Sequence, residues 1–205
     1  VADTSSNRIL FSYGTSPEEG AGQRSAAALD ELCKGRDITA ISHVRGSGFM
    51  FGLQSRMPVQ GDTWEEVRQL DLAGRLAAIN DAETAQKLVD EAKLPKASQL
   101  PWGNVFYLGS DEIPNYADEQ SLKAQAEAAH EHWSETFLRL SRESNGKGLF
   151  NLRMFSSSLK EQAGLFKSEN IFPGLGDAGA HVSQIMDAGW SSFMLSHWQR
   201  ETGYY

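Results

Sequence analysis

With 205 residues, a mass of 22.6 kDa and 40% hydrophobic residues, the chain can build one domain or two small ones around a sizeable core. Its net charge of −8 argues against a nucleic-acid-binding or anionic-membrane surface, and no apolar run reaches the roughly 18 residues of a membrane span. The one cysteine, Cys33, cannot form an internal disulfide, which predicts a packed thiol in a reducing, cytoplasmic compartment. The opening Val1-Ala2-Asp3, without Met or a signal core, predicts a processed or truncated product.

The amino-terminal quarter predicts a strand–helix–strand unit. Apolar segments at residues 8–14 and 38–44 indicate strands, and a helix is expected to begin at Thr15-Ser16-Pro17 and to stop at Gly35. Because such a unit over about thirty-five residues is typical of parallel sheets, we expect a parallel α/β architecture. The next segment, residues 46–53, is predicted to be an apolar loop punctuated by glycine.

The rest of the chain predicts mainly helices with short strands between them. Residues 63–93 have a helical pattern with an internal start at Asn80-Asp81, so two or three helices are expected there. Residues 118–141 predict one long Ala- and Glu-rich helix. The remaining expectations are strands at 105–108, at 149–152 and from residue 171, and helices at 158–166 and 181–198.

The most informative segment is Gly174-Leu175-Gly176-Asp177-Ala178-Gly179-Ala180-His181-Val182, which follows a predicted strand and precedes a predicted helix. Asp177 is then expected at the carboxyl end of a strand, where α/β proteins build active sites. A carboxylate there can bind a divalent metal, act as a general base, or do both. Alternatively, Asp177 caps the following helix and His181 is a core or surface residue; the spacing by itself favours this second interpretation.

A second candidate is His130-Glu131-His132, the one His-x-His in the sequence. On the predicted helix these histidines would point to nearly opposite faces. A zinc site needs such a pair on a strand, or histidines four residues apart on a helix. We therefore interpret His130 and His132 as helix-surface residues.

Residues 177–182, followed by Asp187-Ala188 and by Phe193-Met194-Leu195-Ser196-His197-Trp198, resemble the last barrel strand and following helix of the amidohydrolase superfamily. The resemblance is narrower to the N-acyl-D-amino-acid deacylase (D-aminoacylase) branch, amidohydrolase family 3. Residues 42–53 are similar to that family's strand end and glycine-rich loop, and residues 64–94 to its helical insertion. The similarity covers most of the chain in the family's order.

The resemblance implies roles for four residues. Asp177 would be the metal-associated catalytic carboxylate, and His181 would support or orient the site. His43 and Arg45 match a strand-end pair that would bind substrate, and Arg45 would bind the substrate carboxylate through two hydrogen bonds. A purely structural role for both residues is an equal alternative. Departures from the family pattern, at Gly176, Met186 and Gly189-Trp190, would alter substrate fit.

The fold implied is α/β: part of a (β/α)₈ TIM barrel, its carboxyl-terminal half, forming a single domain over residues 1–205 with a helical insertion at about 57–100. A complete barrel needs about 250 residues, and the family's first-strand His-x-His ligands have no match in the sequence. We therefore expect a fragment, with the zinc of the full-length parent incomplete or absent here.

The implied activity is metal-dependent hydrolysis of a carbon–nitrogen bond, other than a peptide bond, in N-acyl-D-amino acids or similar small amides. A metal-activated water would attack, with Asp177 as general base. The alternatives are an inactive pseudoenzyme or binding fragment that lacks the first-strand ligands, and an interaction domain that uses Phe49-Met50-Phe51. Because half a barrel exposes two strand edges, we also expect a homo-oligomer, in the simplest case a symmetric dimer.

Overall fold

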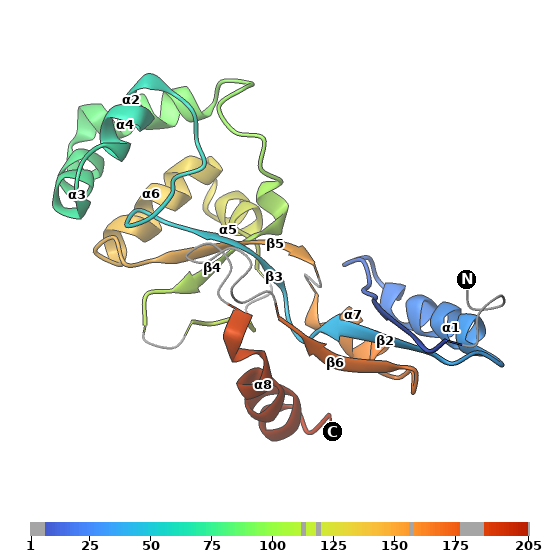
Figure 1. Cartoon of the computed structure of the whole chain (residues 1–205). Helices are drawn as coiled ribbons and strands as arrows, with labels where there is room; N and C mark the ends of the chain where they lie inside the picture. Colours follow the sequence, from blue (N-terminus) through green and yellow to red (C-terminus); the bar gives the residue numbers. More distant parts are fainter. Residues whose placement is uncertain (1–6, 112–113, 118–119, 156–157, 177–186, 205) are drawn as a thin grey trace. The chain divides into compact units, whose positions relative to one another are not determined.

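The computed structural model describes residues 7–111, 114–117, 120–155, 158–176 and 187–204 (Figure 1). Within them the protein is of mixed α/β class, as predicted, and it divides into two compact units. Unit 1 comprises Val1–Gly48 and Arg153–Tyr205, and unit 2 comprises Phe49–Leu152. The single domain expected over the whole chain stays a prediction. No helix in the described part is long and apolar enough to cross a membrane.

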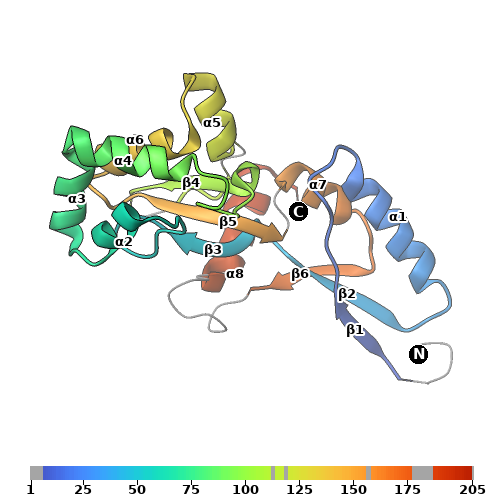
Figure 2. The same ribbon diagram turned by 90° about the horizontal axis from the view of Figure 1, so that it is seen from above.

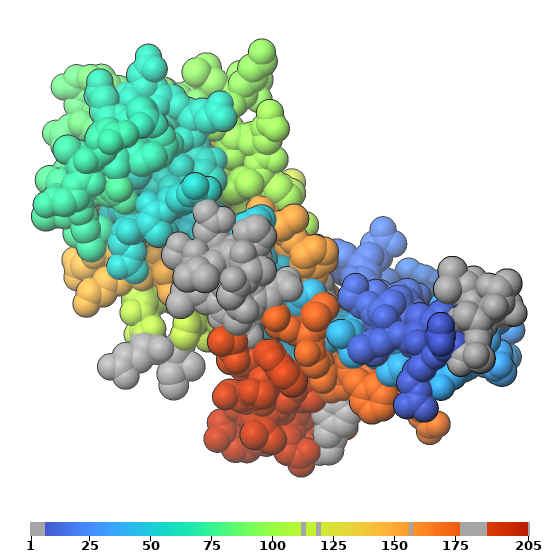
Figure 3. Space-filling view, viewed as in Figure 1, coloured from blue at the N-terminus to red at the C-terminus, as the bar shows by residue number. Residues whose placement is uncertain are grey.

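Unit 1 is built on a three-stranded parallel sheet in the order β1-β2-β6 (Figure 1). Its elements are β1 (Ile9–Ser12), α1 (Ala21–Cys33), β2 (Ile38–His43), α7 (Leu159–Leu165), β6 (Ile171–Leu175), a 3₁₀ turn at Asp187–Gly189, α8 (Trp190–Phe193) and the π-helix η3 (Met194–Glu201). The helices α1 and α7 pack against each other on one face of the sheet (Figure 2). In the space-filling view, the blue amino-terminal and orange carboxyl-terminal parts of unit 1 therefore form one continuous surface (Figure 3).

The two faces of this sheet differ in how much of each is buried by helices. On the helix side, Ile38, Ala40 and Ile171 are buried in a core with Leu29, Leu165 and Trp198. Alternate residues of a strand point to opposite faces, so Leu10, Ile41 and Phe172 lie on the other side. There Leu10 is 63% exposed and Phe172 is 58% exposed. Within the described residues, this face of the parallel sheet thus exposes apolar side chains to solvent.

The helix α1 begins later than the sequence predicts. The expected start at Thr15-Ser16-Pro17 is wrong: α1 starts at Ala21, after Gly20 in the left-handed region at φ 74°. Its first turn is satisfied by Glu161 of α7, whose carboxylate accepts hydrogen bonds from the backbone N–H groups of Gly20 and Gly22 at 3.2 and 2.8 Å. The cap that fixes this start is therefore supplied from 139 residues away.

Unit 2 combines a second three-stranded sheet, in the order β3-β5-β4, with the remaining helices. Its elements are β3 (Ser47–Phe51), α2 (Asp62–Arg68), α3 (Leu72–Asn80), α4 (Ala82–Ala92), the 3₁₀ turn η1 (Trp102–Asn104), β4 (Val105–Gly109), α5 (Leu122–Ala129), α6 (Trp133–Glu143) and β5 (Leu149–Phe155), with β3 and β5 running into unit 1. Two or three helices were expected within 63–93, and the structure has three; Asp81 caps α4 through Thr84 as its position indicated. The loop expected at 46–53 is wrong, because β3 lies there beside β5.

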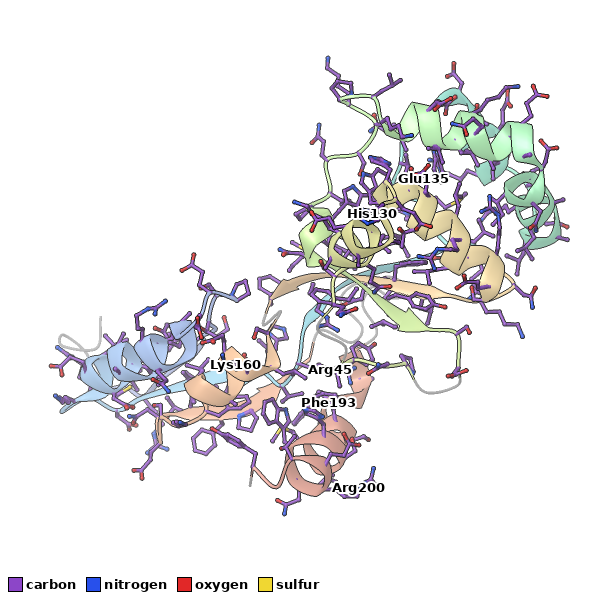
Figure 4. The ribbon with its side chains drawn as sticks, turned by 180° about the vertical axis from the view of Figure 1, so that it is seen from behind. Arg45, His130, Glu135, Lys160, Phe193 and Arg200 are labelled. Atoms are coloured by element: carbon purple, nitrogen blue, oxygen red, sulfur yellow. The ribbon has the colours of Figure 1, made fainter. Side chains whose placement is uncertain are left out.

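The long helix expected over residues 118–141 is also wrong, because it is two helices, α5 and α6, with a break at residues 130–132. His130 ends α5 in the left-handed conformation, at φ 56°, and His132 is the N-cap of α6 in a reciprocal capping box with Glu135. The prediction that both histidines lie on a helix surface is therefore wrong, because they cap the two helices at the break, where Figure 4 labels His130. No proline or glycine marks this break in the sequence.

Candidate functional site

The sequence-predicted site falls partly outside the described residues. Asp177 and His181 belong to the segment 177–186, of which the structure describes nothing. The described residues nearest to them in sequence are Leu175, the last residue of β6, and Gly176. His43 is the last residue of β2, and Arg45 follows two positions later. The geometry of the site is therefore built from the ends of β2 and β6.

The carboxyl ends of β2 and β6 lie side by side. The two strands pair in parallel from Ala40 and Ile171 onwards, and the register shifts after Ser42 so that His43 pairs with Leu175. The shift leaves one extra residue in β6, a bulge of the kind that often redirects side chains near binding sites. The chain that leaves β6 at Gly176 thus starts beside the end of β2.

His43 is half-buried at this edge, and its ring stacks on Phe155 at the end of β5. The ring planes are within 3° of parallel, and the centroids are 5.4 Å apart. This contact fixes the orientation of the imidazole. It is compatible with both roles that the sequence left open for His43, a structural one and substrate binding.

Arg45 is 6% exposed, and its guanidinium lies over the ring of Phe193 in α8, 5.3 Å from the ring centroid (Figure 4). The segment before it is pinned by Trp198 of η3, whose indole Nε1 donates to the carbonyl of Val44 at 2.8 Å. The end of β2 is thus held against the carboxyl-terminal helices. A cation above an aromatic face gains from the ring quadrupole, which stabilises Arg45 where it lies.

A second buried arginine at this edge, Arg153, was missed by the sequence reasoning. Arg153 is 1% exposed, and its side chain crosses Gly46 so closely that a Cβ at Gly46 would collide with it. An arginine inside the largely apolar strand of residues 149–155 was the signal that could have found it. Two buried arginines, Arg45 and Arg153, therefore lie on either side of Gly46 in the structure.

His197 is the other titratable side chain that the predictions did not single out. Its ring stacks on Phe193, with centroids 4.8 Å apart and planes 23° apart, and its Nδ1 lies 3.2 Å from a carboxylate oxygen of Glu201. Phe193 therefore contacts both Arg45 and His197. His197 belongs to the π-helix Met194–Glu201, which directly follows Phe193, and π-helical segments often occur at functional sites.

No metal centre is visible among the described residues, which contain no group of three or more His, Cys, Asp and Glu side chains close enough to hold an ion. His130 and His132 serve as helix caps. Cys33 is buried as predicted, and burial, with a smaller contribution from Asp30, raises the pKa of its thiol. These residues do not fit a zinc site by themselves, so any zinc ligation by Asp177 and His181 stays a prediction.

Comparisons with protein-family models, with curated proteins and with solved structures found no match to this chain. The amidohydrolase resemblance therefore rests on its sequence motifs.

Proposed function

We propose that this chain is the carboxyl-terminal half of a (β/α)₈ amidohydrolase barrel whose activity is hydrolysis of the amide bond of N-acyl-D-amino acids. The observation that carries the proposal is the pairing of His43 with Leu175, which sets the carboxyl ends of β2 and β6 next to each other. In parallel α/β proteins this edge is where active sites form. Asp177 follows Leu175 by two residues in the sequence.

The arrangement of unit 1 supports a barrel over an open, doubly wound sheet. Its three strands lie across the sheet in the order in which they occur along the chain, β1-β2-β6, and α1 packs against α7 on one face. A doubly wound sheet has helices on both faces, whereas a barrel has all of them outside. The apolar face with Leu10, Ile41 and Phe172 matches the branched and bulky side chains that fill a barrel interior.

The proposed roles follow from the chemistry of the side chains. Arg45 pairs with the substrate carboxylate through two parallel N–H···O bonds, and His43 and His181 orient the substrate. The Asp177 carboxylate removes a proton from water, and the hydroxide attacks the amide carbonyl carbon. The C–N bond then breaks as Asp177 returns that proton to the amine, which leaves a carboxylic acid and a D-amino acid. No step is assigned to zinc, because the described residues do not supply its ligands.

The test is hydrolysis of N-acetyl-D-leucine, with N-acetyl-L-leucine as the stereochemical control, by the parent protein that contains this chain. Asp177→Asn is expected to fold normally and to lose roughly two or more orders of magnitude in rate. Asp37→Asn is the matched control, because the carboxylate of Asp37 is on the surface of unit 1 and pairs only with the exposed Arg8 in the contacts described. Near-normal turnover by Asp177→Asn would remove Asp177 from the mechanism.

Two further outcomes separate the alternatives. Saturable binding of N-acetyl-D-leucine without turnover in the parent would favour the pseudoenzyme. Stoichiometric zinc in the purified 205-residue chain would overturn the fragment interpretation, since a half barrel should leave the coordination shell incomplete.

A further inference from the structure

Unit 2 contains a pocket whose lining residues are distant in the sequence from the residues of the proposed reaction. It has a volume of about 510 Å³ and lies between η1, α5 and the break that separates α5 from α6. This volume falls in the range of small-molecule sites, about 300–1,000 Å³. The pocket is formed within unit 2 and does not depend on the proposed amidohydrolase activity.

Two tryptophans contribute to the walls of the pocket. Trp102 and Trp133 stack with centroids 3.8 Å apart and planes 11° apart, and both line the pocket. Trp102 is anchored in the core of unit 2, where the ring of Phe51 meets it edge-on at 6.1 Å. Trp133 is only half-buried. The buried Trp102 thus supports the half-buried indole of Trp133 from below, and a ring held in this way loses little side-chain entropy on binding.

The polar groups of the pocket are balanced in charge. On α5 the ammonium group of Lys123 lies 3.8 Å from the carboxylate of Glu127, and Glu131 is engaged by Arg139 at 3.1 Å. Nδ1 of His132 lies 3.4 Å from the backbone nitrogen of Ser134 and 2.8 Å from the hydroxyl oxygen of the same residue, and the neutral ring carries one N–H donor. The lining therefore offers donors from Lys123 and His132 and an acceptor from Glu127, with its charges matched in pairs.

We propose that this pocket binds a neutral carbohydrate of one or two pyranose rings. A pyranose has an apolar C–H face that packs on an indole, and hydroxyl groups at its edge that both donate and accept hydrogen bonds. The half-buried indole of Trp133 matches the first feature, and the polar groups of Lys123, Glu127 and His132 match the second. A charged ligand is disfavoured because it would compete with the ion pairs that already balance the lining.

The experiment is a titration of the full chain with maltose and with cellobiose, followed through the indole N–H signals in ¹H–¹⁵N NMR spectra. The signals of Trp102 and Trp133 are expected to shift saturably with at least one disaccharide, with a dissociation constant of about 1–10 mM. Trp198 of unit 1 is the internal control and is expected not to shift. The absence of a saturable shift up to about 100 mM of either sugar would overturn the proposal.

Two variants distinguish whether Trp133 binds the sugar or only supports the fold. Trp133→Ala is expected to weaken binding at least about tenfold, whereas Trp133→Phe, which keeps a ring at this position, retains most of it. An unchanged Trp64 signal in both variants reports that the unit 2 core is intact. Equal shifts in the wild type and in Trp133→Ala would overturn the proposal. A saturable shift with adenosine but with neither sugar would also overturn it, by assigning the pocket to flat aromatic ligands.

Discussion

Removing the carboxylate of Glu161 should destabilise unit 1 strongly, because this side chain caps a helix that is distant in sequence. Glu161 lies in the first turn of α7 and is 5% exposed. Its two oxygens accept the N–H groups of Gly20 and Gly22 at the start of α1, where Gly20 offers no side chain to cap the helix. Without it, the buried N–H of Gly22 loses its acceptor.

The magnitude follows from these two bonds. A hydrogen bond to a charged acceptor contributes about 1.5–3 kcal/mol, and a carboxylate at a helix N-terminus adds about 0.3–1 kcal/mol. Because the bond from Gly20 is the longer one, we expect Glu161→Ala to lower the free energy of unfolding by about 3 kcal/mol and Glu161→Gln by about 1–2 kcal/mol. Glu169→Ala, on the exposed surface of the same unit, is the matched control and should change it by less than about 0.5 kcal/mol.

The same contact should make this contribution depend on pH. The bond from Gly22, and less strongly that from Gly20, lowers the pKa of Glu161 against the opposing effect of burial. Since the folded-state pKa lies below the unfolded value of about 4.3, the carboxylate stabilises the fold above that pH. This stabilisation is lost as the pH falls through the folded-state pKa. Urea unfolding and amide exchange of Gly22, at pH 7 and near pH 3, measure it. An equal difference between wild type and Glu161→Gln at both pH values would refute the reasoning.

Three further variants test other parts of the fold. His130→Gly should raise the unfolding free energy by about 0.5–1 kcal/mol, because glycine adopts the left-handed conformation without strain; a lower thermal midpoint would contradict this. Burial, and to a smaller extent Lys93, lowers the pKa of His132 below its unfolded value of about 6.5. The unfolding free energy of the wild type should therefore fall as the pH drops from the unfolded pKa towards the folded one. His132→Asn keeps a cap that does not titrate, so it should flatten the slope of unfolding free energy against pH between pH 7 and 5. Gly22→Ala should destabilise unit 1 by about 2 kcal/mol in urea, because its Cβ would collide with the backbone of Glu161; unchanged stability would show that α1 and α7 can separate.

The sequence by itself determined the elements whose signals are local. Strand β2 follows from the apolar segment at residues 38–44. Helix α7 begins at Leu159, directly after its N-cap Ser158, whose hydroxyl accepts the N–H of Glu161 three residues on. Asp81 caps α4 in the same way. Such signals depend on neighbours within one helical turn, so they can be recognised in the sequence without the fold.

Only the tertiary structure decided the features whose partners are distant in the chain. The start of α1 depends on Glu161, the strand β3 on β5, and the burial of Arg153 on its passage over Gly46. The assignment of Asp177 and His181 to the site rests on sequence motifs. The positions of His43 and Arg45 depend instead on Phe155 and Phe193, each more than 100 residues away in the sequence. Local sequence fixes which conformations a segment favours, but the buried hydrogen bonds and ring contacts that select one of them come from residues that only folding brings together.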